Sequence, residues 1–171
     1  PAFASWPDFR ALSQREDAQQ IVPVEFGANY MEAERNELPL SFYLDYLTHI
    51  EPGETPEPLS YMAQYPLFDE CPSMLADIAT PEWLASTGRG DRYQTMAWIG
   101  PAGTVSPLHC DPYHNAFAQV VGSKRIRMYA PGPDDHTRLL LSTDPLQKNT
   151  STADVFDPTG PLSDLPYIEA L

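Results

Sequence analysis

The sequence lacks the features that define several large classes of protein. Its two cysteines, Cys71 and Cys110, do not form a C-x-x-C pair, so neither a disulfide scaffold nor a zinc site of paired thiolates is supported. No apolar run reaches the roughly 18 residues of a membrane-spanning helix, and the opening PAFASWPDFR has neither region of a secretory signal. We therefore expect an intracellular protein, nuclear or cytoplasmic, with no membrane partner.

Positive charge is scarce. Lysine and arginine together number 10 against 24 aspartates and glutamates, which gives a net charge of −14. Phosphate binding needs clustered basic side chains, and the one local cluster is KRIR at 124–127, so we expect no direct nucleic-acid binding. A solvated acidic surface is the simplest interpretation of this charge, and a basic protein or peptide substrate is the second.

The sequence does contain enough apolar material for one folded domain. It is 171 residues long and 42% hydrophobic, which suffices for a sizeable core. The predicted strands are 21–27, 59–65, 92–100, 108–121 and 124–129, and the predicted helices are 38–50, 71–78 and 80–86. We expect one α+β domain over 1–171, with an N-terminal helical and strand part over 1–90 and barrel strands over 91–171.

The segment 106–132, SPLHCDPYHNAFAQVVGSKRIRMYAPG, carries several ionisable groups within a pattern that predicts strands. Residues two apart in a strand share a face, so His109 and Asp111 are predicted to point at one metal ion, with Asn115 further along that face. A two-residue hairpin at 122–123 pairs Val121 with Lys124 and brings this lysine onto the same face.

An imidazole beside a carboxylate begins the 2-His-1-carboxylate set that holds non-haem Fe(II). A lysine some distance along the face suits the far carboxylate of a dicarboxylic acid bound to that metal. A solvent-facing strand is the simpler alternative. Phe117 and Val121 fall on the predicted face and should be buried, which favours the wall of a pocket.

Residues 98–132, WIGPAGTVSPLHCDPYHNAFAQVVGSKRIRMYAPG, resemble the core of the Jumonji-C (JmjC) dioxygenases. The likeness is greatest to the small hydroxylase-type branch that includes the arginyl hydroxylase. VPVEFG at 22–27, YMAQYPLFDECPSMLADI at 61–78 and NTSTADVFDP at 149–158 resemble that branch in the same order. The resemblance therefore extends from about Ile21 to Leu171, and it implies a cupin-type double-stranded β-helix (jelly-roll) core with N-terminal helices.

The resemblance also implies Fe(II) as cofactor and 2-oxoglutarate as cosubstrate. The activity that it implies is hydroxylation of a protein side chain, possibly arginine, with O₂ consumed and succinate and CO₂ released. The roles that it assigns are metal binding by His109 and Asp111, 2-oxoglutarate binding by Tyr61, Ser106, Asn115 and Lys124, and substrate contact by Glu25, Gln64 and Trp98.

The third iron ligand is expected outside this sequence. In the family a second histidine lies on a later strand, and none of His49, His114 and His136 occupies such a place. We therefore expect an incomplete catalytic domain, whose last ligand and closing strands lie past Leu171, and weak iron binding by the fragment alone. His114 is predicted on the outer face, His136 in a solvated loop, and Cys110 in the core.

Two other functions stay open. An N-methyl-lysine demethylase uses the same chemistry, because a hydroxylated N-methyl group is unstable and loses formaldehyde. A non-catalytic cupin-like binding module that has lost its metal would have no need of the missing histidine. Turnover of 2-oxoglutarate distinguishes enzyme from module, and the mass of the product peptide distinguishes the two enzymes.

Overall fold

The computed structural model describes residues 6, 8–27, 33–79, 82–87, 91–132, 134–144 and 148–171. The chain divides into two compact units, Pro1–Val105 and Ser106–Leu171. Each unit is described by itself below. Within the described residues, no helix is both long and apolar enough to cross a membrane.

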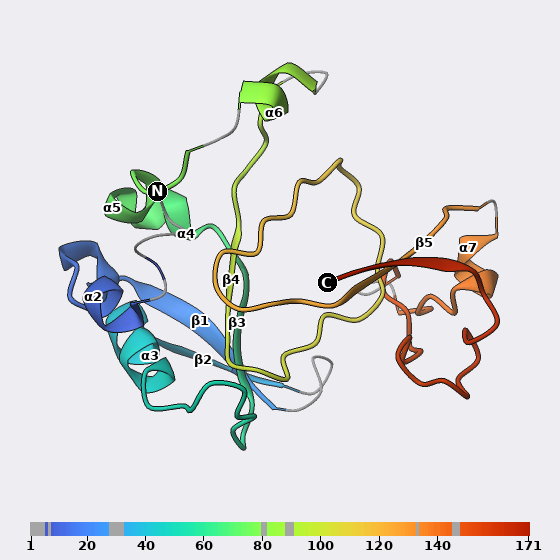
Figure 1. Ribbon diagram of the computed structural model, residues 1–171, viewed down its shortest axis with the longest axis horizontal. Coiled ribbons are helices and arrows are strands. Elements are labelled where there is room, and N and C mark those ends of the chain that lie inside the picture. Colours follow the sequence, from blue (N-terminus) through green and yellow to red (C-terminus); the bar gives the residue numbers. More distant parts are fainter. Residues whose placement is uncertain are drawn as a thin grey trace. The chain divides into compact units, whose positions relative to one another are not determined.

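The first unit is built on a four-stranded antiparallel sheet with the order β2-β1-β3-β4 (Figure 1). Its strands are β1 (Ile21–Phe26), β2 (Glu34–Pro39), β3 (Ser60–Tyr65) and β4 (Ala97–Ile99). Val22 and Val24 of β1 are fully buried, while the residues between and beside them are partly open. This alternation defines a core face, because successive residues of a strand point to opposite sides.

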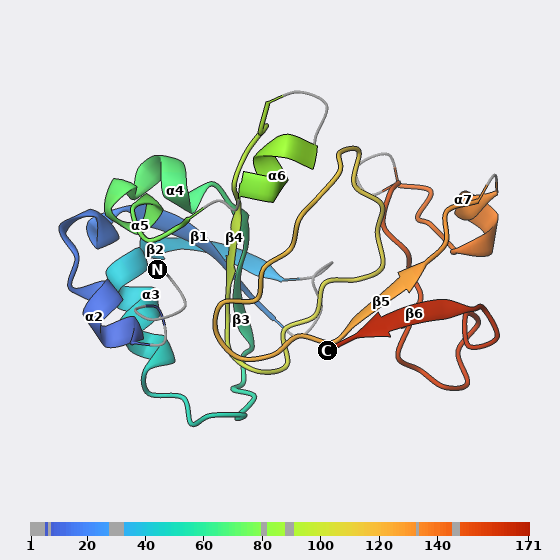
Figure 2. The ribbon, with the colours of Figure 1, turned by 45° about the horizontal axis from the view of Figure 1, so that its top comes forward.

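Short helices precede, follow and connect these strands (Figures 1 and 2). They are α2 (Phe9–Ser13), the 3-10 helix η1 (Glu16–Gln19), α3 (Leu40–Leu47), α4 (Leu67–Glu70), α5 (Pro72–Leu75) and α6 (Glu82–Thr87). Pro39 caps the start of α3 and Pro72 is the first residue of α5, because the fixed φ of proline suits a helix start and its missing N–H costs nothing there.

α3 covers the core face of the sheet. Its residues Leu40, Tyr43, Leu44 and Leu47 are buried at helical spacing. The Tyr43 hydroxyl donates to the carbonyl of Ile99, at 3.1 Å, and burial raises the pKa of this phenol far above its ordinary value. One side chain thus fastens the helix to the short strand β4.

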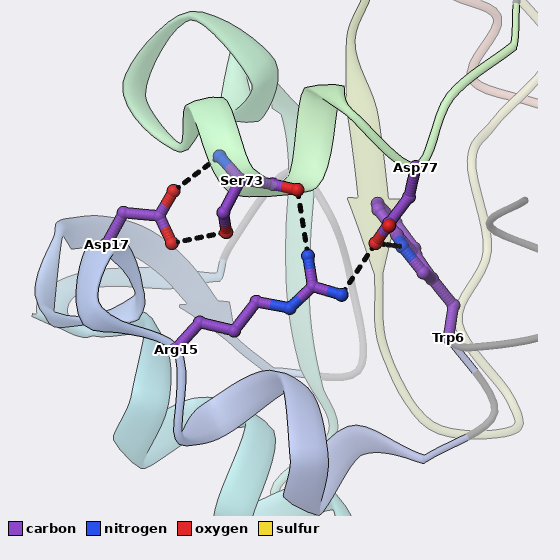
Figure 3. Close-up of polar contacts among 5 residues, drawn as sticks. All are labelled: Trp6, Arg15, Asp17, Ser73 and Asp77. Atoms are coloured by element: carbon purple, nitrogen blue, oxygen red, sulfur yellow. Dashed lines mark hydrogen bonds and ion pairs between the residues drawn. The ribbon is translucent and has the colours of Figure 1, made fainter.

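A polar cluster joins the N-terminal turns to α5 (Figure 3). Arg15 donates to the Ser73 carbonyl, at 2.9 Å, and to Asp77 Oδ2, at 2.7 Å. The Trp6 indole N–H donates to the same Asp77 oxygen, at 2.9 Å, and its ring stacks on Phe68. Asp17 accepts from the backbone N–H and the hydroxyl of Ser73, at 2.8 and 2.7 Å.

The second unit contains the antiparallel pair β5 (Ile126–Tyr129) and β6 (Tyr167–Ala170), and the helical turn α7 (Asp135–Arg138). Arg127 of β5 lies over the rings of Phe156 and Tyr167, at 4.8 and 4.4 Å from their centroids. Its Nε donates to Glu169 of β6, at 2.9 Å. These contacts hold the guanidinium between two aromatic rings and a carboxylate, which stabilises the pairing of the two strands.

Several predicted elements are confirmed by these bounds. The strands predicted at 21–27 and 59–65 are β1 and β3, and the helix predicted at 38–50 contains α3. The two short helices predicted at 71–78 and 80–86 contain or overlap α5 and α6. The strand predicted at 92–100 is confirmed only in its last part, as β4, and β2 was not predicted because its ERNELP segment alternates poorly.

The strand predicted over 108–121 is wrong. Within those described residues only His109 takes part in a β-bridge, and β5 pairs with β6 instead of forming a hairpin at 122–123. Pro112 follows Asp111 directly and has no N–H to donate to a ladder. The predicted burial of Phe117 is wrong as well, because this ring is 50% exposed.

The predicted core position of Cys110 is also wrong. Cys110 is exposed, whereas Cys71 is buried, and neither forms a disulfide. Burial raises the pKa of the Cys71 thiol to about 11, so this cysteine stays protonated at neutral pH. His114 is exposed, as predicted. The predicted loop position of His136 is wrong, because this residue lies in the helical turn α7, and its side chain lies outside the described residues.

The contribution of the polar cluster to stability can be measured at Asp77, which accepts hydrogen bonds from Trp6 and Arg15. Partial burial raises the pKa of Asp77, but the hydrogen bonds from Trp6 and Arg15 outweigh this effect and leave the pKa below its usual value. A carboxylate whose pKa is lowered by folding contributes stability above its unfolded pKa and loses it as the pH falls through the folded one. We expect Asp77→Asn to lower the free energy of unfolding at pH 7 by about 1–2 kcal/mol.

The difference between Asp77→Asn and the parent should shrink as the pH falls below about 4, the ordinary range of an aspartate. Denaturant unfolding at a series of pH values measures it. Asp164→Asn removes the same charge at an exposed position and should leave the unfolding free energy unchanged at pH 7. Equal losses in the two variants, or a loss independent of pH, would contradict the role given to this cluster.

Candidate functional site

His109 and Asp111 come together in the second unit. The His109 Nε2 lies 3.6 Å from the Asp111 Oδ1, and the two side chains are about equally open, at 40% and 42% exposed. Two ligand atoms that each lie about 2.1 Å from one ion can be at most about 4.2 Å apart. Their spacing therefore allows both to bind a single metal ion.

The segment 149–151 holds the histidine in place. His109 forms an antiparallel bridge with Thr150. The backbone N–H of Cys110 donates to the Asn149 carbonyl, at 3.0 Å, and the Asn149 side-chain amide donates back to the Cys110 carbonyl, at 3.1 Å. Ser151 N–H donates to Leu108 O, at 2.7 Å. The segment 149–158 was noted for its family resemblance, which assigned it no role. The structure shows that its first residues pair with 108–110.

The imidazole is oriented by a backbone carbonyl. Nδ1 of His109 lies 2.7 Å from the Pro107 carbonyl oxygen, which can only accept, so Nδ1 carries the proton in this contact. In the neutral ring Nε2 then presents a lone pair toward Asp111. A metal ion between the two groups, or a proton on Nε2 that makes the contact an ion pair, would each make this approach favourable. A carbonyl that fixes the tautomer is the usual outer partner of a metal-binding histidine.

These two donors fit part of the set that holds non-haem iron. Imidazole nitrogen and carboxylate oxygen are the right ligand types for Fe(II). Within the described residues, no third histidine, cysteine, aspartate or glutamate joins them. The geometry of the pair is compatible with two corners of a facial triad, and its role as a pair of metal ligands stays a prediction.

The other site residues predicted in this unit are Lys124, Ser106 and Asn115. Lys124 does not pair with Val121; its ammonium lies 5.8 Å from the centroid of the Phe117 ring, and its side chain is half-buried. Ser106 and Asn115 are exposed. The contact with Phe117 brings the lysine to the segment that follows the metal pair, although by a cation–π contact and not by the predicted hairpin.

In the first unit, Glu25 and Tyr61 lie on one face of the sheet. They are direct cross-strand neighbours in β1 and β3, and such neighbours share a face. Together with Gly27, Ala33, Leu59, Thr104 and Val105 they line a cavity of about 20 Å³. Burial raises the pKa of the Glu25 carboxyl, and the charge of its other neighbour, Arg35, partly offsets this.

Trp98 belongs to the same face. Ala97 and Ile99 on either side of it are buried on the core face, and Trp98 is 40% exposed. Gln64 lies where the pairing of β3 and β4 slips, since Met62 faces Ile99 and Tyr65 faces Ala97. This bulge gives Gln64 a φ of +50° and an exposed side chain, and a bulge of this kind re-aims a side chain away from its regular side.

Gly100 was not singled out from the sequence, yet it shapes the Tyr61 site. A Cβ at this position would lie 2.8 Å from both Tyr61 Cδ2 and Thr104 Cγ2, and 3.1 Å from the Ser60 carbonyl. The missing side chain therefore allows the tyrosine ring to pack against the backbone. The WIGP segment contained the glycine, but only the fold reveals what it contacts.

The sequence matches a known family and several proteins of known name. Residues 8–167 match the family described as "Cupin-like domain". The chain is 36% identical to Jumonji C domain-containing protein 5 of Drosophila melanogaster, over 80% of this chain and 35% of that protein. It is 35% identical to Lysine-specific demethylase 8 of Danio rerio, over 92% of this chain and 38% of that protein.

A more distant relative carries a different activity in its name. The human Bifunctional peptidase and (3S)-lysyl hydroxylase JMJD7 is 30% identical over 77% of this chain and 44% of its own length. The chain thus spans about a third of the length of its first relatives. Family and relatives agree with the helices and antiparallel sheets seen here, and JmjC domains are generally dependent on Fe(II) and 2-oxoglutarate. The chain belongs to the cupin-like family, as a JmjC domain with an α+β jelly-roll fold.

Proposed function

We propose that this chain belongs to an Fe(II)- and 2-oxoglutarate-dependent oxygenase that hydroxylates a protein side chain, with arginine as the candidate residue. The observation that carries the proposal is the convergence of His109 Nε2 and Asp111 Oδ1 to 3.6 Å, with the imidazole oriented by Pro107. Membership of the JmjC family supplies the cosubstrate. An intracellular location and a basic protein substrate remain predictions.

Iron held at this site would activate O₂, which is the oxidant; one oxygen atom would enter succinate as 2-oxoglutarate loses CO₂, and the other would enter the substrate. His109 and Asp111 hold the metal, and their partial exposure leaves room for further ligands. The protein's remaining task is to orient the cosubstrate and the target carbon. Asp111 contributes the anionic ligand, which offsets part of the charge of the metal.

Lys124 is the proposed partner of the distal carboxylate of 2-oxoglutarate. Its half-buried ammonium lies over an aromatic ring, so it is partly withdrawn from water and its charge acts more strongly on an anion. Tyr61, Ser106 and Asn115 are proposed as further hydrogen-bonding partners. The packing of Tyr61 against Gly100 supports a fixed position for its ring.

The sheet face of the first unit is the proposed contact for the substrate side chain. Glu25 offers a carboxylate that is partly withdrawn from water, which suits a guanidinium or an ammonium. Trp98 offers an exposed ring on the same face, and the bulge directs Gln64 away from the core. A cationic substrate side chain also agrees with the net charge of −14.

The second candidate is an N-methyl-lysine demethylase. It is favoured by the names of relatives such as Lysine-specific demethylase 8 and Lysine-specific demethylase JMJ30 of Arabidopsis thaliana. Both candidates need the same iron and cosubstrate contacts, so the product separates them. Mass spectrometry of a reacted peptide should show a gain of one oxygen. Loss of a methyl group with release of formaldehyde would establish the demethylase instead.

The metal assignment predicts the effect of removing either ligand. Asp111→Ala and His109→Ala should each abolish measurable Fe(II) binding, because a single remaining protein donor of this pair cannot hold the ion. Both side chains are about 40% exposed, so the thermal unfolding of the metal-free protein should change little. Anaerobic titration with Fe(II) measures the affinity.

His114→Ala is the matched control, since it removes an exposed histidine five positions from His109. This variant should bind Fe(II) like the parent. If His114→Ala loses the metal, or if Asp111→Ala retains it, the ligand assignment is wrong.

The cosubstrate assignment predicts a change in the 2-oxoglutarate requirement. Lys124→Ala should raise the KM for 2-oxoglutarate by roughly tenfold to a hundredfold, because a charge-assisted hydrogen bond of this kind is worth about 1.5–3 kcal/mol. Fe(II) affinity should stay as in the parent. Lys148→Ala, at an exposed lysine, should leave both quantities unchanged. An unaltered KM in Lys124→Ala would mean that another group binds the carboxylate.

A further inference from the structure

Glu25 has two different neighbours on the sheet face that is proposed to receive the substrate. β1 runs between β2 and β3 (Figure 1), and Glu25 is directly opposite Arg35 on β2 and Tyr61 on β3. Direct cross-strand neighbours have Cβ atoms about 4.5–5.5 Å apart and point to the same side of a sheet. The Arg35 side chain therefore starts from the same face as the Glu25 carboxylate, one strand away.

Arg35 and Glu25 are near each other without forming a salt bridge. In the residues that the structure describes, no ion pair joins them, and the Glu25 carboxylate accepts no hydrogen bond. Arg35 is exposed and Glu25 is half-buried. The carboxylate thus experiences a nearby positive charge while its oxygens stay open to an incoming group.

Among the described residues, Arg35 is the cation that the register places beside Glu25. Glu37 shares this face, two positions along β2 and diagonal to Glu25. Tyr61 of β3 is a phenol, and the segment 104–105, which lines the same small cavity, contains no ionisable side chain. Burial raises the pKa of the Glu25 carboxyl, and the charge of Arg35 lowers it in part. Arg35 thus already acts on Glu25 as a cationic ligand would.

We propose that Arg35 is the counter-ion of Glu25 in the substrate-free protein and competes with a cationic side chain for this carboxylate. A guanidinium or ammonium that approaches Glu25 must also approach Arg35, and like charges repel. Arg35 therefore lowers the affinity of this face for a cation while it keeps Glu25 ionised to a lower pH. The competition rests on the proposed contact between Glu25 and the substrate, whereas the role as counter-ion does not.

The first measurement is the titration of the Glu25 carboxyl by ¹³C NMR in the full chain. Arg35→Gln removes the charge but keeps a long polar side chain, so the pKa of Glu25 should rise. Arg35→Lys keeps the charge and should leave this pKa as in the parent. Arg10→Gln removes an exposed arginine of α2 and should leave it unchanged too. The rise in Arg35→Gln should shrink at about 1 M salt, because salt screens exposed charges.

The second measurement is the binding of N-acetylarginine amide at pH 7, followed by the shift of the same carboxyl signal. Arg35→Gln should bind this compound about twofold to fivefold more tightly than the parent, the range of one exposed cross-strand charge. The gain should shrink as the pH falls, because Glu25 is protonated first in the variant. N-acetylcitrulline amide has no charge, so it should show no difference between the two proteins.

The two measurements can fail separately. An equal pKa of Glu25 in the parent and Arg35→Gln, or an equal change in Arg10→Gln, would overturn the proposal. A raised pKa with equal affinity for the arginine amide would overturn the competition. If the pKa rises and the amide binds to neither protein, the proposed contact of Glu25 with the substrate is wrong and the counter-ion stands. Thermal unfolding checks that each variant remains folded.

Discussion

The antiparallel register of β1 and β3 is the constraint on which the first unit depends. It pairs Glu25 with Tyr61 and Phe26 with Ser60. The Glu25 and Tyr61 side chains therefore lie on one face of the sheet, and the side chains of the core lie on the other. A slip of one residue would exchange the two faces. α3 packs behind this sheet, where the Tyr43 hydroxyl contacts the Ser60 hydroxyl of β3 and donates to the carbonyl of Ile99 in β4. Packing on one face therefore determines which side chains are available on the other.

The second unit positions its histidine through one local contact and one contact that is distant in sequence. A backbone carbonyl orients His109, and the segment 149–151 holds the residues on either side of it. Asp111 is only two positions along the chain, so no long-range packing is needed to bring its carboxylate near the imidazole. The two donors approach each other while both remain partly exposed, which suits the proposed metal site, where small molecules would also have to bind.

The elements that the sequence predicted well are those whose pattern is local. β1 has alternating buried valines and α3 has buried residues at helical spacing, and either pattern can be recognised without knowing the partner. The prediction of a strand over 108–121 was wrong because a local pattern does not show which segment a strand pairs with. The true partners, 149–151 for His109 and β6 for β5, are distant in sequence. The close approach of Gly100 to Tyr61 was invisible for the same reason. The functional roles of the site residues came from motif resemblance and stay predictions.

The central claim is that His109 and Asp111 hold an iron ion that drives oxidation of 2-oxoglutarate. The most direct test is the release of succinate from 2-oxoglutarate by the protein under air, with Fe(II) supplied and then withheld by a chelator. The account predicts succinate release that requires Fe(II), stops with the chelator and is absent in Asp111→Ala. Succinate release at the same rate without iron, or in Asp111→Ala, would contradict it.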